Sequence, residues 1–273
     1  MIVAEVMPPS GGKRRAFVPT MGALHEGHRA LMRVAREQVG SDGEVVVSVF
    51  VNPLQFGADE DFERYPRTLD SDAAACAAEG VDILYVPNLD QVYGTDPSIT
   101  VDPGALGAEL EGASRPGHFA GVLTVVTILL QQVAPDVAIF GEKDYQQLEL
   151  IRRLCRDLSL PVTIVGVPTV RENDGLALSS RNRYLSSAER QVAGAIPIAL
   201  RSGAAESTPS RIRTAALSQL QDPGLDIDYV EVRGQDLGPV PASGEGRLLI
   251  AVHVGRTRLI DNCPVTVTSD GAT

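Results

Sequence analysis

Two histidines, His25 and His28, stand three residues apart in the stretch 19–28, where glycines flank His25 on both sides. The apolar run 16–18 precedes this stretch, and a segment with helical periodicity begins near Gly27. A helix N-terminus offers unpaired N–H groups and the positive end of the helix dipole, which together bind anions. Histidines placed there can donate hydrogen bonds or positive charge to a phosphate. The stretch therefore indicates a nucleotide site.

The same two histidines could instead be zinc ligands. A catalytic zinc site needs a third ligand, and the spacing differs by one residue from the His-Glu-x-x-His zinc motif. The remaining histidines, His118 and His253, stand in unrelated contexts. We therefore expect His25 and His28 to bind phosphate, with no metal site built from protein side chains.

Three more loops that follow apolar runs carry polar side chains, at 52–56, 141–147 and 171–184. Cations suited to a polyphosphate are supplied by Lys143, Arg181 and Arg183, and hydroxyl and backbone donors by Ser179 and Ser180. Asp144 is placed to bind a ribose hydroxyl, while Gln55 and Gln147 can hold a small polar molecule through both donor and acceptor atoms.

Each of these loops also has an ordinary structural explanation. The segment 141–144 could be a solvated turn, 179–181 a helix-capping loop, and Gln55 a surface or turn residue. The functional interpretation gains weight because the loops follow strands of one predicted sheet. In an open α/β sheet, ligands bind at the carboxyl ends of the strands. We expect all four loops to open onto one face.

Strand and helix patterns alternate through the first 168 residues. All-apolar, β-branched runs such as 45–51 suit strands that are buried on both faces of a parallel sheet. The alternation predicts a doubly wound parallel α/β sheet. We predict strands at 16–20, 45–51, 81–86, 137–140 and 162–167, and helices from Gly27, over 71–79 with Asp70 as its cap, over 120–133 and over 148–158.

The pattern changes beyond Val170. Helical segments at 187–203 and 209–221 are followed by strand-like segments at 227–232, 248–254 and 257–260. This order predicts a smaller α+β unit at the C-terminal end. We therefore assign residues 1–169 to a Rossmann-like domain and residues 170–273 to a smaller C-terminal α+β domain.

Composition narrows the class of protein. A chain of 273 residues with 44% hydrophobic and 22% charged residues can fold as one large or two modest globular domains. The net charge of −11 argues against nucleic-acid binding, which needs a basic surface. The longest apolar stretch, 121–130, is too short to span a bilayer, and residues 1–15 lack the apolar core of a signal peptide. We expect a cytoplasmic protein that does not bind membranes.

The three cysteines, Cys76, Cys155 and Cys263, are odd in number and far apart in the sequence. No Cys-x-x-Cys pair is present, so a structural zinc site has little support. We expect reduced, mostly buried thiols that behave as small hydrophobic side chains.

Four motifs occur in order along the chain: 18–28 (VPTMGALHEGH), 50–56 (FVNPLQF), 140–147 (FGEKDYQQ) and 171–185 (RENDGLALSSRNRYL). Together they resemble the pantothenate synthetases, and the resemblance extends over residues 15–262. That family belongs to the nucleotidyltransferase group, whose His-x-x-His loop also occurs in class I aminoacyl-tRNA synthetases.

The resemblance implies ATP-dependent condensation of pantoate with β-alanine, with release of AMP and pyrophosphate. The pantoate carboxylate would attack the α-phosphorus of ATP, and the β-alanine amine would then attack the carbonyl of the resulting pantoyl adenylate. The resemblance also implies Mg²⁺ on the ATP phosphates, a homodimer, and a C-terminal domain that acts as a lid over the domain that binds ATP and pantoate.

The resemblance assigns catalytic roles to His28, as the family's proton donor, and to His25 and Lys143. Gln55 would contact pantoate and then β-alanine, and Gln147 would contact pantoate. The residues that would bind ATP are Met21, Gly22, Ala23, Leu24, His25, Glu26, Gly27, His28, Gly141, Glu142, Lys143, Asp144, Val170, Leu178, Ser179, Ser180 and Arg181.

The chain departs from the family pattern in two places. Leu178 stands where the family commonly has methionine, and the similar volume of the two side chains predicts little effect. The leader before the first predicted strand is shorter than usual and has no evident helix. The segment 111–118 resembles a loop that covers the family's site, which makes Glu111 and Arg115 further candidates; a Gly/Pro-rich surface connection explains the segment nearly as well.

Other functions share parts of this pattern. An adenylyltransferase that acts on a phosphorylated small molecule would have the histidine loop, but it would not need two neutral glutamines facing a small carboxylate. A non-catalytic nucleotide-binding module would bind ATP and form no AMP. A tRNA-charging enzyme is disfavoured by the net charge of −11 and by the lack of an anticodon-binding domain in 273 residues.

Overall fold

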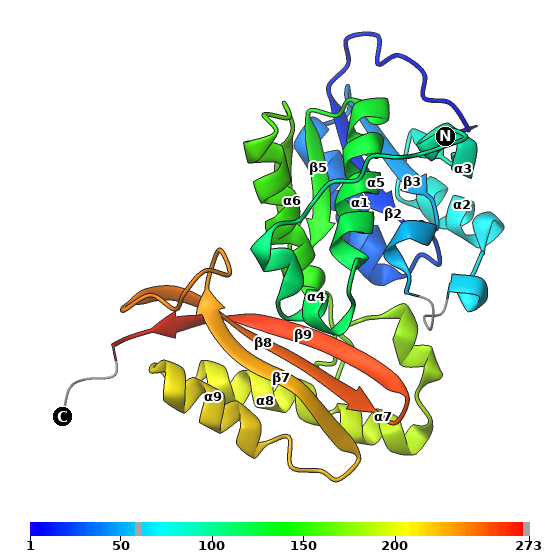
Figure 1. Ribbon diagram of the computed structural model, residues 1–273. Helices are drawn as coiled ribbons and strands as arrows, with labels where there is room; N and C mark the ends of the chain where they lie inside the picture. The colour runs from blue at the N-terminus through cyan, green and yellow to red at the C-terminus, as the bar shows by residue number, and fades with distance from the viewer. Residues whose placement is uncertain (58–61, 270–273) are drawn as a thin grey trace. The chain divides into compact units, whose positions relative to one another are not determined.

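Figure 1 shows the computed structural model of the chain, which describes residues 1–57 and 62–269. The chain forms two compact units. The first consists of residues 1–142 and 146–168, and the second of residues 143–145 and 169–273.

The first unit is built on a six-stranded parallel sheet with the strand order β1-β4-β3-β2-β5-β6. Its strands are β1 (Ile2–Ala4), β2 (Arg15–Thr20), β3 (Glu44–Val49), β4 (Ile83–Tyr85), β5 (Val137–Gly141) and β6 (Thr163–Val167). Its α-helices are α1 (Glu26–Val39), α2 (Leu69–Ala78), α3 (Leu89–Tyr93), α4 (Glu111–Ser114), α5 (His118–Val133) and α6 (Tyr145–Asp157), the last of which starts in the second unit with Tyr145.

Helices cover both faces of this sheet. Val18 and its neighbours on one face form a core with Leu31 and Met32 of α1. The side chain of Phe17 points to the opposite face and is fully buried as well. On that second face α6 comes so close to β6 that a Cβ at Gly166 would lie 2.9 Å from a methyl carbon of Leu148. Burial on both faces explains the all-apolar strand sequences, and the doubly wound sheet predicted from them is confirmed.

The carboxyl ends of β2 and β5 spread apart, although the two strands are neighbours. Their pairing is limited to Ala16 and Phe17, whereas β2 pairs with β3 along all its residues. The carbonyl of Arg15 accepts a hydrogen bond from Asp136, so the backbone groups of odd-numbered β2 residues face β5. Pro19 has no N–H to donate on that side, which ends the pairing. Strands β3 and β4 lie on one side of β2, and β5 and β6 lie on its other side, so the strand order switches between β2 and β5. Open α/β sheets bind ligands at such a switch point.

The second unit contains a three-stranded antiparallel sheet in the order β7-β8-β9 with three helices packed against it. Its strands are β7 (Leu225–Gly234), β8 (Gly244–Val254) and β9 (Thr257–Val267), and its helices are α7 (Ser187–Ala193), α8 (Ala195–Ala204) and α9 (Pro209–Ser218). Leu248 and Ile250 of β8 lie at the centre of the core, against Ile196 and Leu200 of α8. The predicted smaller α+β part is confirmed.

Several predicted elements differ in detail. Asp70 does not cap α2, because the N-cap position is Thr68 and Asp70 lies inside the first turn. The predicted helix over 187–203 is two helices, α7 and α8, separated at Gly194. Pro197 explains the break, because it has no N–H to donate to the carbonyl four residues earlier.

Two strands were missed or underestimated. The short edge strand β1 pairs in parallel with β4 and lies in the leader, where no element was expected. Strand β9 continues to Val267 past Asp261, Asn262 and Pro264, which read as a strand end in the sequence. Asp261 and Asn262 are buried in a polar network, and Pro264 is tolerated because β9 is an edge strand. No helix within residues 1–57 and 62–269 is long and apolar enough to cross a membrane.

Candidate active site

His25 and His28 form the start of α1 and hydrogen bond to its backbone. His25 is the N-cap residue, and its Nδ1 accepts a hydrogen bond from the Gly27 N–H at 3.1 Å. His28 Nδ1 in turn accepts one from the His25 N–H at 3.2 Å. The two rings lie 4.1 Å apart between centroids and are tilted by 40°. The pair is a capping box in which imidazoles take the places usually held by a hydroxyl and a carboxylate.

This capping arrangement assigns the tautomer of both rings. A neutral imidazole carries one proton, and a nitrogen that accepts a hydrogen bond does not hold it. With both Nδ1 atoms accepting backbone N–H groups, the proton of each ring lies on Nε2, an assignment made from the hydrogen-bond network. Each ring therefore presents an Nε2–H donor, which suits hydrogen bonding to an anion.

The turn that leads into the histidines adopts a left-handed backbone at two successive residues, Gly22 with φ +84° and Ala23 with φ +51°. The N–H groups of Ala23 and Leu24 donate to the carboxylate of Asp72 in α2, at 3.1 and 2.8 Å. Gly22 donates its N–H to the Thr20 hydroxyl at 3.2 Å. Gly22 and Ala23 are buried, and that they bind ATP stays a prediction.

Gln55 lies in a 3-10 turn, η1 (Pro53–Gln55), that follows β3. Its Oε1 accepts a hydrogen bond from Asn52 Nδ2 at 3.0 Å, and its Nε2 donates to the sulfur of Met21 at 3.2 Å. The same Asn52 amide donates to the Gly121 carbonyl of α5 at 3.1 Å. These contacts join the loops after β2 and β3 and fix the orientation of the Gln55 amide.

The segment 111–118 contacts Gln55 from α4 and α5. His118 Nδ1 lies 2.8 Å from the Gln55 carbonyl oxygen, and Arg115 donates to the same oxygen at 3.4 Å. The backbone N–H of Glu111 donates to Oε1 of the buried Gln146 at 3.0 Å. Glu111 is itself only 8% exposed and His118 is buried too, whereas residues 113, 114, 116 and 117 are exposed, so the surface connection describes only the middle of this segment.

The two glutamines that follow β5 differ in their surroundings. Gln146 is buried, and its Nε2 donates to the carbonyls of Leu106 and Glu109, both at 2.8 Å. Gln147 is half-buried, and its side-chain amide has no hydrogen-bond partner in the part of the chain that the structure describes. Gln146 therefore holds protein backbone, whereas the Gln147 amide remains available to a ligand.

Lys143 and Asp144 belong to the second unit, together with Tyr145. The Lys143 carbonyl accepts a hydrogen bond from Asn262 Nδ2 at 2.9 Å, and the Tyr145 hydroxyl donates to the Gln235 carbonyl at 2.8 Å. The guanidinium of Arg247 lies 3.9 Å from the centre of the Tyr145 ring. Backbone and aromatic contacts thus hold this segment, while the Lys143 ammonium pairs loosely with Asp144 at 3.7 Å.

Val170 and Leu178 pair across a small hairpin in the second unit, where the Leu178 N–H donates to the Val170 carbonyl at 2.9 Å. Arg171 fixes this hairpin to β9 through two hydrogen bonds to the buried Asp261 carboxylate, at 2.6 and 3.0 Å. Burial lowers the pKa of the Arg171 guanidinium, but the hydrogen bonds and charge of Asp261 more than offset this, so the pKa lies above its usual value.

Ser179 caps the 3-10 turn η5 (Ser180–Tyr184), because its Oγ accepts the Arg181 N–H at 3.2 Å. The capping explanation given above therefore holds for Ser179. Asn182 donates from Nδ2 to Glu172 and to the Ala177 carbonyl, at 2.8 and 3.0 Å, which ties η5 to the hairpin. The Asn182 Oδ1 is buried and has no partner among the described residues.

The expected site residues thus fall into two sets. In the first unit, residues 21–28, Gln55, Gly141, Glu142 and Gln147 lie at or shortly after the carboxyl ends of β2, β3 and β5. In the second unit, Lys143 and Asp144 form one segment, and Val170, Leu178, Ser179, Ser180 and Arg181 form another. That the fourth loop opens onto the same face as the other three stays a prediction.

Three residues that shape these loops were missed in the sequence: Asp72, Asn52 and Asn262. Asp72 shares the buried face of α2 with Cys76, four residues away, and a carboxylate at such a position is the signal that could have revealed it. Asn52 and Asn262 carried no comparable signal, because their partners Gly121 and Lys143 are remote in the sequence.

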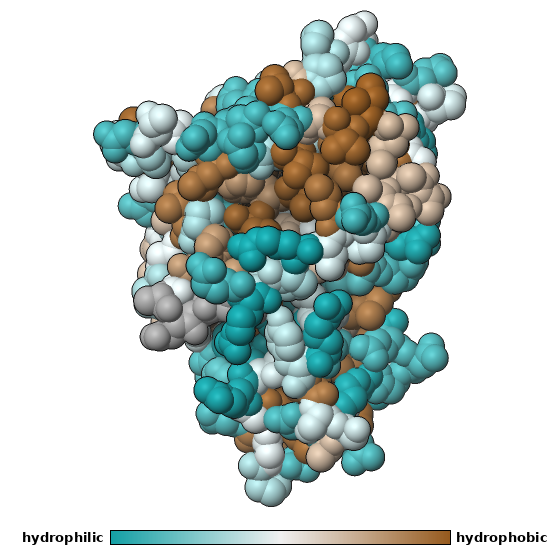
Figure 2. Space-filling model, turned by 90° about the vertical axis from the view of Figure 1, so that its right-hand side faces the viewer, coloured by the Kyte–Doolittle hydropathy of each residue, from teal (hydrophilic) through white to brown (hydrophobic). Residues whose placement is uncertain are grey.

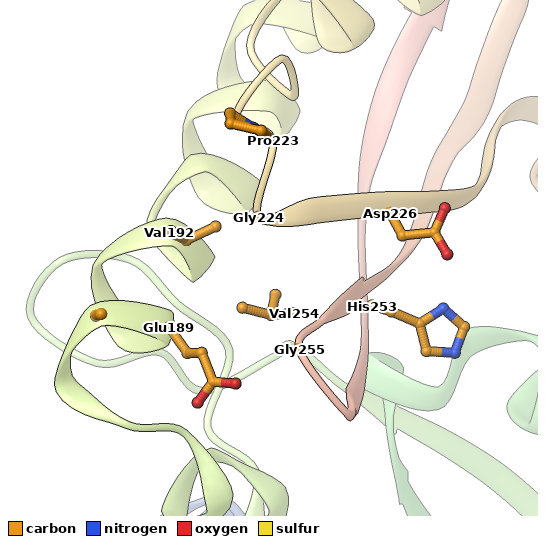
Figure 3. A pocket seen from close by; sticks show the side chains of 9 residues that line it. Glu189, Val192, Pro223, Gly224, Asp226, His253, Val254 and Gly255 are labelled. Atoms are coloured by element: carbon orange, nitrogen blue, oxygen red, sulfur yellow. The ribbon is translucent and has the colours of Figure 1, made fainter.

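Two surface cavities of the second unit lie beside α7. One has a volume of about 440 Å³ and is lined by α7, residues 223–226 and the β8–β9 turn; the other, of about 640 Å³, continues along α7 and α8. Figure 3 shows that Val192 and Val254 point into the smaller cavity, whereas Asp226 and His253 extend away from Val192. Neither cavity contains an expected site residue.

Among residues 1–57 and 62–269, no group of three or more His, Cys, Asp or Glu side chains is placed to hold a metal ion.

Comparison with known proteins agrees with this geometry. Residues 3–264 match the family described as pantoate-β-alanine ligase. The chain is 57% identical over 263 residues to the pantothenate synthetase of Saccharopolyspora erythraea, which covers 95% of this chain and 86% of that protein. It is 58% identical over 259 residues to that of Nocardia farcinica, covering 94% of this chain and 80% of that protein.

Solved structures show the same fold. A crystal structure of pantothenate synthetase from Thermus thermophilus superposes with a TM-score of 0.89 at 42% identity, over 96% of this chain and 99% of that one. A pantoate-β-alanine ligase from Francisella tularensis, complexed with Beta-gamma ATP and β-alanine, gives 0.80 at 34% identity, over 96% and 97% of the two chains. With the histidine loop at the switch point of the sheet and a family match over nearly its whole length, this chain belongs to the pantoate-β-alanine ligase family.

Proposed function

We propose that this chain carries out the reaction of its family, the ATP-dependent condensation of pantoate with β-alanine, with the residues of the loops described above. The observation that carries the assignment of roles is the pair of Nδ1-anchored histidines at the N-terminus of α1. Two Nε2–H donors beside a helix N-terminus form a site for a phosphate group whose negative charge increases during reaction.

In the first step, a carboxylate oxygen of pantoate forms a bond to the α-phosphorus of ATP. The bond from the α-phosphorus to the bridging oxygen breaks, and pyrophosphate leaves with the electron pair. His25 and His28 would donate hydrogen bonds to the α-phosphate oxygens and to the leaving pyrophosphate. Such donors accelerate the reaction because they are already oriented before the charge develops.

In the second step, the β-alanine amine attacks the activated carbonyl of pantoyl adenylate. A carbon–nitrogen bond forms, the carbon–oxygen bond to the phosphate breaks, AMP leaves, and the amine nitrogen loses a proton. Gln55 would hold pantoate and then orient β-alanine, because its amide is already fixed by Asn52 and Met21. Gln147 would bind pantoate through the amide that has no hydrogen-bond partner within the described residues.

The residues of the second unit would bind other parts of ATP. Lys143, whose backbone carbonyl accepts a hydrogen bond from Asn262, would neutralise phosphate charge. Asp144 would accept a hydrogen bond from a ribose hydroxyl. Val170 and Leu178 would pack against the adenine, since they are adjacent in one hairpin. Ser179, Ser180 and Arg181 would bind the phosphate tail. Residues 1–169 would then act as the domain that binds ATP and pantoate, and residues 170–273 as a lid.

Mg²⁺ would be held mainly by ATP phosphate oxygens, which are ligands this hard cation prefers. Bound there, it would neutralise phosphate charge. The two histidines are anchored through Nδ1 and present N–H donors. These donors suit the phosphate oxygens, whereas a cation would need a ring nitrogen with a free lone pair.

We also propose that the protein works as a cytoplasmic homodimer. Figure 2 shows hydrophobic residues gathered on the side of the first unit that carries α2 and α3. The edge strand β1 exposes Ile2 and Val3, with exposed fractions of 62% and 56%, and an exposed apolar edge favours association. A mass measured by light scattering that corresponds to one chain would contradict the dimer.

The reaction itself is tested by turnover with ATP, pantoate and β-alanine, followed by chromatography of the products. We expect equal amounts of pantothenate and AMP, and one pyrophosphate released per site when β-alanine is omitted. An adenylyltransferase would instead release pyrophosphate without forming AMP after β-alanine is added. A nucleotide-binding module would bind ATP and form no AMP with any pair of acid and amine.

A further inference from the structure

Asp72 is a buried carboxylate of α2 whose side chain serves a neighbouring loop. It is only 1% exposed. Oδ1 accepts the Leu24 N–H at 2.8 Å, and Oδ2 accepts the Ala23 N–H at 3.1 Å. The Thr68 hydroxyl donates to Oδ2 at 3.2 Å. Both oxygens of the carboxylate are thus used to hold the turn that precedes His25.

The Asp72 carboxylate is also supported by the residue at the start of its own helix. Thr68 occupies the N-cap position of α2 but makes no side-chain cap there. Its hydroxyl donates to Asp72 instead. A buried carboxylate requires such donors, because an unpaired charge away from water is strongly unfavourable.

The turn needs this support because its backbone conformation is unfavourable. Ala23 has a left-handed backbone, which residues other than glycine adopt at an energetic cost. Gly22 is left-handed too, and a Cβ there would lie 3.0 Å from both Asp72 Oδ2 and a Val49 methyl carbon. Hydrogen bonds to a charged acceptor are stronger than neutral ones, so the Asp72 carboxylate is well suited to stabilise this backbone.

The position of the turn decides where the two imidazoles lie. Leu24, which donates to Asp72, is bonded directly to His25, the N-cap of α1. The His25 N–H in turn holds the His28 ring. A continuous series of contacts therefore runs from the carboxylate through the turn to both histidine side chains.

We propose that Asp72 is a positioning residue for adenylate formation. Its carboxylate holds the turn at residues 22–24 so that His25 and His28 present their Nε2–H groups in the orientation that the α-phosphate requires. This inference rests on the proposed role of the histidines in the first step.

The first test is Asp72→Asn, which keeps the volume and replaces one acceptor oxygen by an NH₂ group that faces backbone N–H donors. We expect the single-turnover rate of pantoate-dependent pyrophosphate release to fall about 10- to 100-fold, because small misplacements of catalytic groups have effects of this size. The rate of the second step, measured with preformed pantoyl adenylate, should change less than about 3-fold. An equal loss in both steps would overturn the proposal.

A double-mutant cycle with His28→Ala separates positioning from general stabilisation. If Asp72 acts through the histidines, Asp72→Asn should lower the rate of the His28→Ala enzyme by less than about 3-fold. If the fold-reductions in rate of the two single variants multiply in the double variant, Asp72 does not act through His28. The His28→Ala variant alone also tests the proposed function, because an unchanged rate of pyrophosphate release in that variant would contradict the proposed role of His28.

Asp136→Asn is the matched control. The Asp136 carboxylate accepts the Arg15 N–H at 2.7 Å, which is a carboxylate-to-backbone hydrogen bond at the opposite end of the same strand, β2. This variant should lower the midpoint of thermal unfolding and leave the rate of pyrophosphate release unchanged. If it reduces that rate as much as Asp72→Asn does, the effect is one of stability.

Thr68→Val gives a milder second variant in case Asp72→Asn does not fold. It removes only the hydroxyl that donates to Asp72 Oδ2. We expect a 2- to 5-fold slower first step, together with changed amide proton shifts of Ala23 and Leu24 in nuclear magnetic resonance spectra. Unchanged amide shifts and an unchanged rate would overturn the proposal.

Discussion

At the scale of single residues, the backbone contacts of His25 and His28 favour one chemical role over another. Both Nδ1 atoms accept backbone N–H groups, so each ring offers an Nε2–H donor. Protonation of Nδ1 would break the cap that holds the ring. The geometry therefore favours stabilisation of charge on the phosphates by hydrogen bonds, with no need for the ring to abstract a proton.

His28→Ala should reduce the rate of adenylate formation about 100-fold or more, while the dissociation constant of ATP rises less than about 5-fold, because the donor acts mainly on charge that develops in the transition state. Single-turnover pyrophosphate release and equilibrium ATP binding measure the two effects. Equal losses in both would show that His28 binds only the ground state.

Gln147→Ala should raise the KM for pantoate about 10-fold or more and leave ATP binding nearly unchanged, because the half-buried Gln147 amide is available to a ligand. Gln146→Ala is the contrasting neighbour. That change removes three hydrogen bonds to the backbone around residues 106–111 and should lower the thermal midpoint instead. A collapse of ATP affinity in Gln147→Ala would contradict the pantoate assignment.

At the scale of elements, close packing of α5 against η1 sets the position of Gln55. A Cβ on Gly121 would lie 2.2 Å from the Leu54 carbonyl oxygen, so no larger residue fits without moving η1. The Asn52 side chain stabilises the same contact, because its amide donates a hydrogen bond to the Gly121 carbonyl. Helix α5 thus helps to position the glutamine that we propose to bind substrate.

Gly121→Ala should destabilise the protein by about 1–3 kcal/mol through overpacking and also raise the KM for pantoate, because η1 and Gln55 must shift. Gly203→Ala in α8 is the matched control. Its Cβ would lie 2.5 Å from a Leu248 methyl carbon in the core of the second unit. It should cost similar stability in thermal unfolding with no change in the KM for pantoate; a similar rise in both variants would contradict the prediction.

At the scale of the whole molecule, buried thiols affect stability at high pH. The three cysteines are free, and two of them, Cys76 and Cys155, are buried. Burial raises the pKa of Cys76 from an ordinary 9.0 to about 12, with the charge of Asp72 adding to the shift. Burial likewise raises the pKa of Cys155 and of Cys263 to about 11.

Thiols with raised pKa values stabilise the folded state at low pH, because burial in the folded protein disfavours the charged thiolate and not the neutral thiol. This stabilisation is complete below the ordinary pKa of 9.0 and is lost as the pH rises towards 11 and 12. The free energy of unfolding, measured by denaturant titration, should therefore fall between pH 9 and pH 11. Cys155→Ala should make this fall less steep, and an unchanged slope would contradict the role of that thiol.

The sequence by itself determined the class of fold and the contents of the loops. The alternating apolar runs and helical periodicities required a parallel sheet covered on both faces, because only burial on both faces suits strands without polar positions. The His-x-x-His loop and the other three motifs identified the family before any geometry was known, because residue type and spacing are local properties of a sequence.

Tertiary structure alone decided which residues support those loops. Asp72 read as part of an Ala-rich helix, and only folding brought its carboxylate to the N–H groups of Ala23 and Leu24. Asn52 and Asn262 find partners 69 and 119 residues away. Contacts of this kind depend on the packing of distant elements, and no spacing in the sequence encodes them.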